Sequence, residues 1–388
     1  MSDTLLDAAK RYQLESVALR RWFHSHPEAS FHERHTTRRI REELDALGIE
    51  VAAAGETGTV GILRGRAVGP VLGLRADIDA LEIEEKNEVD YRSQNPGLMH
   101  ACGHDAHTAA LLTAARLLLE RREQFDGTIK LIFQPAEEIG RGAASVIATG
   151  ALDDVDAFFG IHVRAGLPVG KVALKAGAAM AGANSLKIVV NGKSGHAGHP
   201  DEAVDAIAAG CAIVEALQHI VAREVSPTEP AVVSVCQFHA GTRDNIVANR
   251  AEISGTVRVT SDKARAQVAE ALRRVVAGIS QAHRVTSQVE CDFATPILLN
   301  AEDLYPTVVE AAGDILPKDA VEGFIPKLGT EDFSVYGSIA PAFFAFVGSG
   351  GEYPHHHERF DIEEEVLAIS AALHAAFAFR YFENNLKK

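Results

Sequence analysis

The segment 184–294 breaks the secondary-structure pattern of the chain around it, and this break constrains the fold more than any other feature. Within the segment the periodicity reads strand, helix, strand, strand, helix, strand, with long helical runs at 202–223 and 261–283. On either side, short apolar runs typical of buried strands alternate with helical patterns. This order predicts an α/β domain formed by residues 1–183 and 295–388, with a two-layer α+β domain, residues 184–294, inserted into it.

Length and composition agree with two soluble domains. The 388 residues exceed one ordinary hydrophobic core. The formal net charge of −15 argues against nucleic acid or an anionic membrane as a partner, because neither is attracted to an acidic surface. The four cysteines are far apart, the N-terminal residues lack a signal-peptide pattern, and no run of about 18 uninterrupted apolar residues suggests a membrane span. These features predict a cytoplasmic protein with reduced thiols.

The sequence MHACGHDAH at 99–107 is the densest group of reactive side chains, with three histidines, a thiol and a carboxylate. Cys102 and His104 are two residues apart, so an extended or turning backbone would direct both side chains the same way, as ligands of one ion require. The alternative is a buried cysteine among solvated histidines at a helix start. Together with the remote residues described below, the cluster indicates a metal site.

Two pairs of carboxylates follow strands expected at 71–75 and 127–133. The pairs are Asp77 with Asp79 and Glu137 with Glu138. Strand ends at a sheet edge are where α/β proteins tend to place their sites. In the second pair, one carboxylate can bind a metal while the other carries protons. The alternative for both pairs is a turn that the carboxylates only cap or solvate.

Nine sequence fragments, in this order, carry a family resemblance. They are HSHPEASFHERHTT, GLRADIDALEI, MHACGHDAHTAALL, FQPAEE, GIHV, NGKSGHAGHP, GTRDNIVANRAEISGTVR, GTEDFS and HHHERFDIEEE. Through them the chain resembles the M20 metallopeptidase family over nearly its whole length. Within that family it is most similar to the amidohydrolase branch, which contains hippurate hydrolases, N-acyl-amino-acid amidohydrolases and plant auxin-conjugate hydrolases.

The resemblance implies a catalytic α/β domain with two divalent metal ions and an inserted α+β dimerisation, or lid, domain. It makes metal ligands of Cys102, His104, Glu138, His162 and His356. His162 read by itself would be an ordinary core histidine. The family's H-x-x-x-F pattern with Phe360 selects His356, while His355 and His357 remain alternatives. The metal itself stays open among Zn²⁺, Co²⁺, Ni²⁺ and Mn²⁺, since a thiolate favours softer ions and a carboxylate accepts harder ones.

The resemblance also assigns three residues that are not ligands. Glu137 would be the general base and acid, taking a proton from water and passing it to the leaving nitrogen. His196 resembles the family histidine that reaches across a dimer to stabilise the oxyanion. Asn245 resembles the family asparagine that seats the substrate, although a turn residue at a strand start is an alternative reading.

Three departures from the family lie where it shapes substrate contacts. In the turn that begins at His196, the histidine expected after Pro200 is missing and His199 precedes the proline instead. Ala248 stands where the family has the proline of N-V-I-P, and Glu82 replaces another common proline. These changes leave the substrate open.

The expected activity is therefore metal-dependent hydrolysis of the amide bond of an N-acyl amino acid, hippurate-like or N-acetylated, to a carboxylic acid and a free amino acid. Alternatives on the same machinery are a carboxypeptidase or dipeptidase and an N-acetyl-diaminopimelate deacetylase. A different class is a non-catalytic binding protein that keeps the metal for structure, against which Glu137 beside Glu138 argues. The expected partners are a small-molecule substrate and a second copy of the chain, in a homodimer or a higher homo-oligomer.

Overall fold

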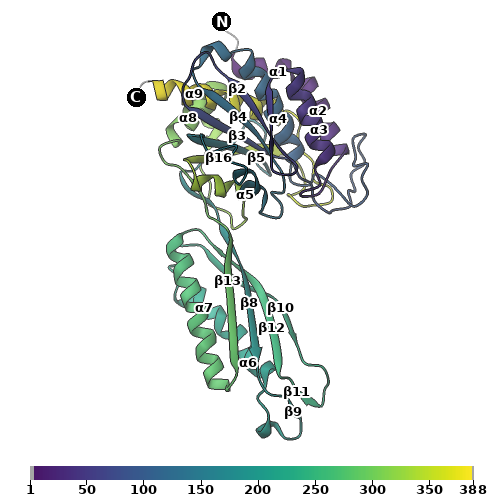
Figure 1. Cartoon of the computed structure of the whole chain (residues 1–388), viewed down its shortest axis with the longest axis vertical. Coiled ribbons are helices and arrows are strands. Elements are labelled where there is room, and N and C mark those ends of the chain that lie inside the picture. Colours follow the sequence, from purple (N-terminus) through teal and green to yellow (C-terminus); the bar gives the residue numbers. More distant parts are fainter. Residues whose placement is uncertain (1–3, 387–388) are drawn as a thin grey trace. The chain divides into compact units, whose positions relative to one another are not determined.

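The computed structural model describes residues 4–386 and divides the chain into two compact units (Figure 1). The first, here unit 1, comprises residues 4–177, 299–325 and 332–386. The second, unit 2, comprises residues 178–298 and 326–331. Each unit has its own cluster of buried apolar side chains, so each has its own hydrophobic core.

Unit 1 is built on an eight-stranded sheet of order β1-β2-β4-β3-β5-β16-β6-β15. Its centre is parallel, because β3 pairs in parallel with β4 and β5, and β5 with β16. The antiparallel pairs are β1 with β2, β2 with β4 and β6 with β16. The strands are β1 (Glu50–Ala54), β2 (Gly58–Arg64), β3 (Val71–Asp77), β4 (Thr128–Gln134), β5 (Ala157–Ala165), β6 (Val172–Ala173), β15 (Val321–Glu322) and β16 (Ala342–Gly350).

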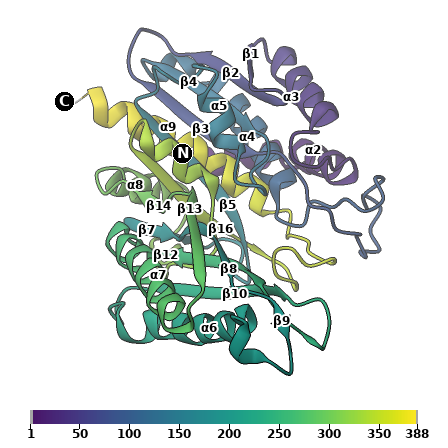
Figure 2. The same cartoon turned by 60° about the horizontal axis from the view of Figure 1, so that its bottom comes forward.

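The central strands are buried on both faces. Residues 72–77 of β3 are all buried, and because successive side chains of a strand point to opposite faces, both faces of β3 are covered. Helices α4 and α9 pack against each other and against β5, while α5 and η4 pack against each other (Figure 2). The helices are α1 (Leu5–Arg11), α2 (Gln13–Ser25), α3 (Arg34–Ala46), α4 (His104–Leu119), α5 (Gly142–Ile147), α8 (Tyr305–Ile315) and α9 (Val366–Leu386), with the short η1 (Arg122–Gln124), η3 (Lys318–Ala320) and η4 (Asp332–Ser338).

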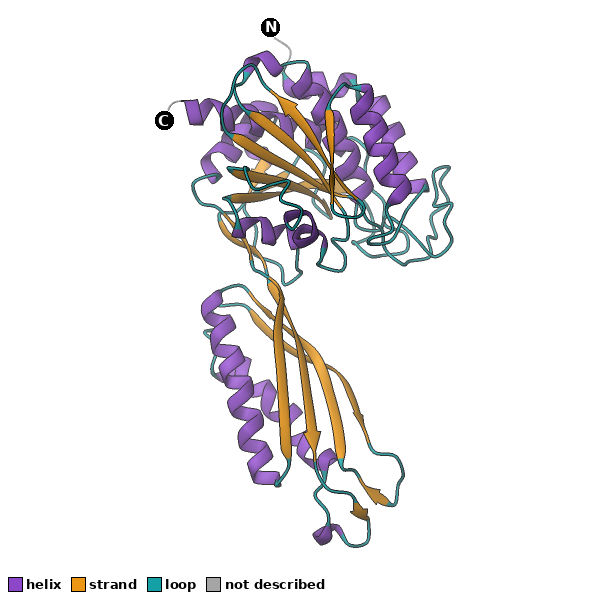
Figure 3. Cartoon of the chain, viewed as in Figure 1, coloured by secondary structure: helices purple, strands orange, loops and turns teal. Residues whose placement is uncertain are grey.

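Unit 2 is a four-stranded antiparallel sheet of order β10-β12-β8-β13 with α6 and α7 packed against it (Figure 3). The elements are β8 (Gly182–Asn191), α6 (Ala206–Arg223), β10 (Ala231–Ala240), β12 (Arg250–Val259), α7 (Asp262–His283) and β13 (Thr286–Thr295). At one end, β9 (Gly195–His196) and β11 (Ile246–Val247) pair as a small antiparallel ribbon. The short helix η2 (Pro200–Glu202) follows β9 in the chain. β7 (Gly177–Met180) pairs with β14 (Leu298–Asn300).

The predicted fold class, an α/β domain with an inserted two-layer α+β domain, is confirmed. The element order of the insert is the predicted one, β8-α6-β10-β12-α7-β13. The units divide at 177/178 and 298/299, whereas the sequence pattern placed boundaries at 183/184 and 294/295. The segment 326–331 also joins unit 2, where Arg258 Nη1 donates to Thr330 Oγ1 at 3.2 Å.

Two helices are long and apolar enough, by length and composition alone, to cross a membrane. In the window Val366–Asn385 of α9, 83% of the residues are buried within the protein, as in the core helix of a soluble fold. In α6, Ala206–Arg223, 33% of the residues are buried, because only one face packs on the sheet of unit 2. Apolar character alone is therefore weak evidence for a membrane span in this chain.

Candidate metal centre

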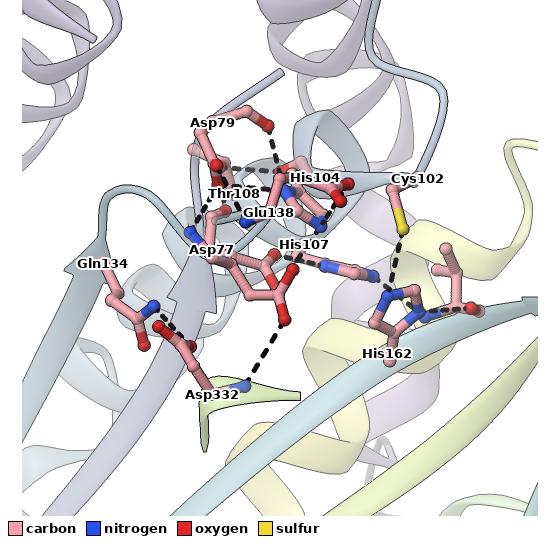
Figure 4. Close-up of polar contacts among 12 residues, drawn as sticks. Asp77, Asp79, Cys102, His104, His107, Thr108, Gln134, Glu138, His162 and Asp332 are labelled. Atoms are coloured by element: carbon pink, nitrogen blue, oxygen red, sulfur yellow. Dashed lines mark hydrogen bonds and ion pairs between the residues drawn. The ribbon is translucent and has the colours of Figure 1, made fainter. Parts of the chain in front are cut away.

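The candidate site of unit 1 lies where its parallel strands end (Figure 4). Asp77, the last residue of β3, is in register with Gln134, the last residue of β4, so the loops that follow both strands start at one edge. The first loop carries Asp79, and the second carries Glu137 and Glu138. This edge is the usual position of sites in open α/β sheets.

The turn that carries Glu137 and Glu138 is held by Asp79. The backbone N–H groups of Glu137 and Glu138 donate to the two carboxylate oxygens of Asp79, each at 3.1 Å. Ser30 donates to the same carboxylate at 2.7 Å, and Asp79 is only 1% exposed. Ala136 has a positive φ of 53°, which is uncommon for a residue with a side chain. Asp79 therefore caps this turn, the role that the alternative reading offered for the Asp77–Asp79 pair, and it does so as a buried carboxylate.

Two histidines present their Nε2 atoms to the same region. His104, the first residue of α4, donates from Nδ1 to the backbone oxygen of Asp79 at 2.9 Å. His162 of β5 donates from Nδ1 to the oxygen of Val163 at 2.6 Å. A carbonyl oxygen only accepts, so in both rings Nδ1 carries a proton, and Nε2 is the atom left to bind a metal. Such bonds are the usual way in which metal-binding histidines are oriented.

The structure brings all the sequence-predicted ligands of unit 1 together around Cys102. One group of donor atoms comprises Cys102, His104 and His162, and a second comprises Cys102, Glu138 and His356; within each group the atoms lie within 4.8 Å of one another. The Sγ of Cys102 is 3.5 Å from His162 Nε2. Cys102 thus belongs to both groups of donor atoms.

The three consecutive histidines near the C-terminus lie in different environments. His355 Nε2 accepts the N–H of Ala165 at 3.2 Å, and His357 Nδ1 accepts the N–H of Arg359 at 3.0 Å. His356 Nε2 is 3.5 Å from Glu138 Oε2, and its backbone has a positive φ of 65°. Among the described residues, His356 is the member of the triplet whose ring joins the donor groups.

The donor set fits divalent cations. The Nε2 of His104 and the Oε1 of Glu138 are buried and make no hydrogen bond to the described part of the chain. Burial, together with the neighbouring Glu138 carboxylate, raises the pKa of the Cys102 thiol well above its ordinary value. Burial likewise raises the pKa of Glu138 to about 7. A bound cation would reverse both shifts, because it stabilises the thiolate and the carboxylate.

Sequence reasoning left Asp77 without a role, assigned none to His107 of the 99–107 cluster and did not consider Arg75. His107 Nδ1 donates to Asp77 Oδ1 at 2.6 Å, while its Nε2 accepts the N–H of Val163 at 2.9 Å. Both nitrogens are engaged, so His107 supports the site and is not available as a ligand. Burial alone would raise the pKa of Asp77, but Arg75, 2.6 Å away, holds it well below the usual range. The position of Asp77 at the strand end was the available signal.

The other two predicted site residues lie in unit 2. His196 ends β9 and pairs with Ile246 of β11, directly after Asn245. His196 Nδ1 accepts the N–H of Gly198 at 3.0 Å, so its Nε2–H is the remaining donor. Both side chains line an open cleft of about 530 Å³. The cleft is lined by Ser194, Gly195, His196, Arg243, Asn245 and Ile246.

Residues 73–380 match the family described as Peptidase family M20/M25/M40. The chain belongs to the M20 family. It is 39% identical to an N-acetylcysteine deacetylase of Bacillus subtilis, over 96% of this chain and 98% of that protein. It is 38% identical to thermostable carboxypeptidase 2 of Saccharolobus solfataricus, over 94% of this chain and 95% of that protein. The family resemblance predicted from the motifs is confirmed.

A solved M20 structure shares the fold over nearly the whole chain. It is a dinuclear metal-binding peptidase of Bacillus subtilis, 36% identical, with a TM-score of 0.86, 96% of this chain and 99% of that chain being covered. Membership of M20 and the donor groups at the sheet edge make the protein a metal-dependent hydrolase of amide or peptide bonds. The prediction of an enzyme is confirmed.

Proposed function

We propose that this M20 protein is an amidohydrolase that cleaves N-acyl amino acids, N-acetylated or hippurate-like, to a carboxylic acid and a free amino acid. One observation carries the proposal, namely the turn, held by the buried Asp79, that places Glu137 next to the ligand candidate Glu138. The oxygen and nitrogen donors of His104, Glu137 and Glu138 lie within 4.8 Å of one another. Similarity to an N-acetylcysteine deacetylase supports the amide of an acylated amino acid as the bond that is cleaved.

In this proposal Cys102, His104, Glu138, His162 and His356 hold two divalent ions, drawn from Zn²⁺, Co²⁺, Ni²⁺ and Mn²⁺. Divalent ions in such a site would lower the pKa of a bound water toward about 7 and polarise the carbonyl of the amide. Similarity to a dinuclear metal-binding peptidase supports the number of ions.

Glu137 acts as the proton carrier. Its Oε1 accepts the backbone N–H of Asp332 at 3.4 Å, and its own N–H is held by Asp79, so its position is set from two sides. A carboxylate held beside the ligands can take a proton from water and deliver it to the leaving nitrogen, a contribution of about 10²- to 10⁴-fold in rate.

Unit 2 has a cleft of its own, whose residues we propose take part in substrate recognition. The exposed Nε2–H of His196 is a donor for the oxyanion that develops on the amide oxygen. Asn245 offers an amide to the substrate. Arg243 is the one charged side chain among the residues that line this cleft in the described structure. A cationic cleft in a chain with net charge −15 favours a substrate that carries a carboxylate, as N-acyl amino acids do.

We further propose a homodimer formed through unit 2. β10 is an edge strand of its sheet, and its residues 236–240 are exposed. Phe238 on β10 and Ile207 on α6 are 36% and 39% exposed, which gives this side of the unit apolar surface next to unpaired backbone groups.

All four cysteines are free thiols, which supports a reducing compartment such as the cytoplasm.

A peptidase acting on small peptides is the second candidate, because a relative at 38% identity is named a carboxypeptidase. The same donor groups and Glu137 would serve either reaction. The candidates differ in whether the acyl side of the bond must be an amino acid.

The experiment that tests the proposal measures product release from N-acetyl and N-benzoyl amino acids and from dipeptides, with the metal-stripped enzyme reconstituted with each divalent ion. Glu137→Gln should lower kcat by about 10²- to 10⁴-fold with the metal content unchanged. Glu138→Gln is the matched control and should lose metal. Cleavage of dipeptides but not of N-acyl amino acids would favour the peptidase function. An active Glu137→Gln variant would show that Glu137 is not the proton carrier.

A further inference from the structure

Arg20 on α2 is a fully buried arginine outside the proposed ligand set. Its side chain is 0% exposed, and it precedes residue 73, where the match to the M20 family begins. Its Nε lies 2.8 Å from Asp105 Oδ2, and its Nη2 lies 2.7 Å from Asp361 Oδ1. A buried guanidinium is costly unless such charged partners compensate for the lost water.

The two carboxylates that Arg20 joins belong to the two segments that carry the candidate ligands. Asp105 directly follows His104, three residues after Cys102. Asp361 lies five residues after His356, in the loop before α9. These segments are more than 250 residues apart in the chain, and one guanidinium bridges them. A backbone bond from His356 N–H to the oxygen of Ala101, 2.7 Å long, also connects them.

Both carboxylates are oriented by further partners, so the guanidinium meets them in a defined geometry. His24, one turn after Arg20, places Nδ1 at 2.7 Å from Asp105 Oδ2, and Asp105 Oδ1 accepts the N–H of Ala106 at 2.9 Å. Tyr91 donates its hydroxyl to Asp361 Oδ2 at 2.8 Å.

The loop on the Asp361 side needs such support. His356 has a φ of 65°, a conformation that a residue with a side chain keeps only where its surroundings hold it. Replacing a buried ion pair by apolar groups is often neutral for stability, so stability alone does not account for a buried arginine at this position. Geometry offers an explanation: one planar guanidinium that bonds two planar carboxylates fixes the separation between the two segments that carry those carboxylates.

We propose that Arg20 is a positioning residue of the metal centre, which ties the segment of Cys102 and His104 to the segment of His356 so that both present their donors to the same ions. The inference rests on the proposed ligand assignment. Arg20 touches neither ion nor substrate and acts through Asp105 and Asp361. The role is chemically specific to arginine, because lysine is a point charge that cannot bond two carboxylates through a planar fork.

The test measures the affinity of the full-length protein for Zn²⁺ and Mn²⁺ by competition with a chelator. Arg20→Met and Arg20→Lys should each weaken binding about 10- to 100-fold, the usual effect of removing an outer-shell partner. Asp361→Asn, which leaves the pair of Arg20 with Asp105 in place, should act in the same direction to a smaller extent. Hydrogen exchange in the metal-free protein should rise in 99–107 and 354–362.

Arg21→Met is the matched control. Arg21 is the next residue on α2, is 45% exposed and pairs with Glu364 at 2.7 Å, without a bond to Asp105 or Asp361. Its loss should leave metal affinity unchanged. A second control, Leu44→Ala in the buried face of α3, lowers stability away from both segments and should also leave the affinity unchanged.

Wild-type affinity in a folded Arg20→Lys or Asp361→Asn variant would overturn the positioning role, as would an equal loss of affinity in Leu44→Ala. A wild-type protein that binds no divalent ion would instead overturn the ligand assignment and, with it, this inference. The two failures are therefore distinguished by the wild-type titration alone.

Discussion

Cys102 is the residue on which the proposed centre depends most, because it belongs to both groups of donor atoms. Burial raises the pKa of its thiol, so in the metal-free protein it is protonated at neutral pH. Binding of divalent ions must therefore release the thiol proton, and metal affinity should rise with pH.

Replacing Cys102 by serine should reduce the metal content below two ions per chain and weaken the remaining binding by at least about 10-fold, since serine is a poor ligand at neutral pH. Metal analysis of the purified variant after dialysis against a fixed free metal concentration measures this. Cys236→Ser is the control, because Cys236 is an exposed free thiol on β10. A Cys102→Ser protein with a full complement of ions would show that the thiol is not a ligand.

Arg243 tests the nature of the substrate. If its guanidinium binds the substrate carboxylate, Arg243→Ala should raise KM for an N-acyl amino acid about 10- to 100-fold, as expected for a charged hydrogen bond worth about 1.5–3 kcal/mol. The same substrate with its carboxylate amidated should be affected little. The control is Arg250→Ala, an exposed arginine of unit 2 that pairs with Glu252 at 2.8 Å. An equal effect of Arg243→Ala on both substrates would contradict carboxylate recognition.

At the scale of elements, β3 determines where the site lies, because its carboxyl end carries Asp77 and leads to Asp79. Its packing leaves no space at Gly73, where an added Cβ would lie 2.6 Å from the ring of Phe158 on β5. The glycine therefore permits the close contact between neighbouring strands that aligns their ends.

Gly73→Val should lower the free energy of unfolding by about 1–3 kcal/mol, the usual cost of overpacking a core. Chemical denaturation followed by circular dichroism measures it. Gly278→Ala in α7 is the opposite case, since nothing lies within 4 Å of the added Cβ, and it should raise the free energy of unfolding by about 0.5–1 kcal/mol. Wild-type stability of Gly73→Val would show that the β3–β5 contact relaxes without cost.

At the scale of the whole molecule, the chain combines two cores with different tasks. Unit 1 holds the donor groups and Glu137, while unit 2 holds His196, Arg243 and Asn245 and presents an edge strand. The edge strand is a liability in an isolated unit, because unpaired backbone groups invite association. A second copy of the chain would cover it.

The proposed dimer should therefore dissociate when charge is placed on this side of unit 2. Phe238→Lys should convert the wild-type dimer to a monomer in sedimentation velocity at micromolar concentration, because the lysine would bury a charge at the interface. Val68→Lys, at a fully exposed position of unit 1, is the control and should leave the sedimentation coefficient unchanged. A wild-type monomer at these concentrations would contradict the dimer.

The sequence by itself determined the fold class and the family, because strand and helix periodicities are local properties and the motifs are short. It also pointed to the residues that gather around Cys102. The H-x-x-x-F pattern had already selected His356, and the tertiary structure shows how its environment differs from those of His355 and His357. Only the tertiary structure showed Asp79 as the cap of the Glu137–Glu138 turn and joined Asp105 to Asp361 through Arg20. These relations depend on contacts between segments that are remote in the chain. They also depend on which ring nitrogen of a histidine is hydrogen-bonded to the backbone. No local pattern carries that information.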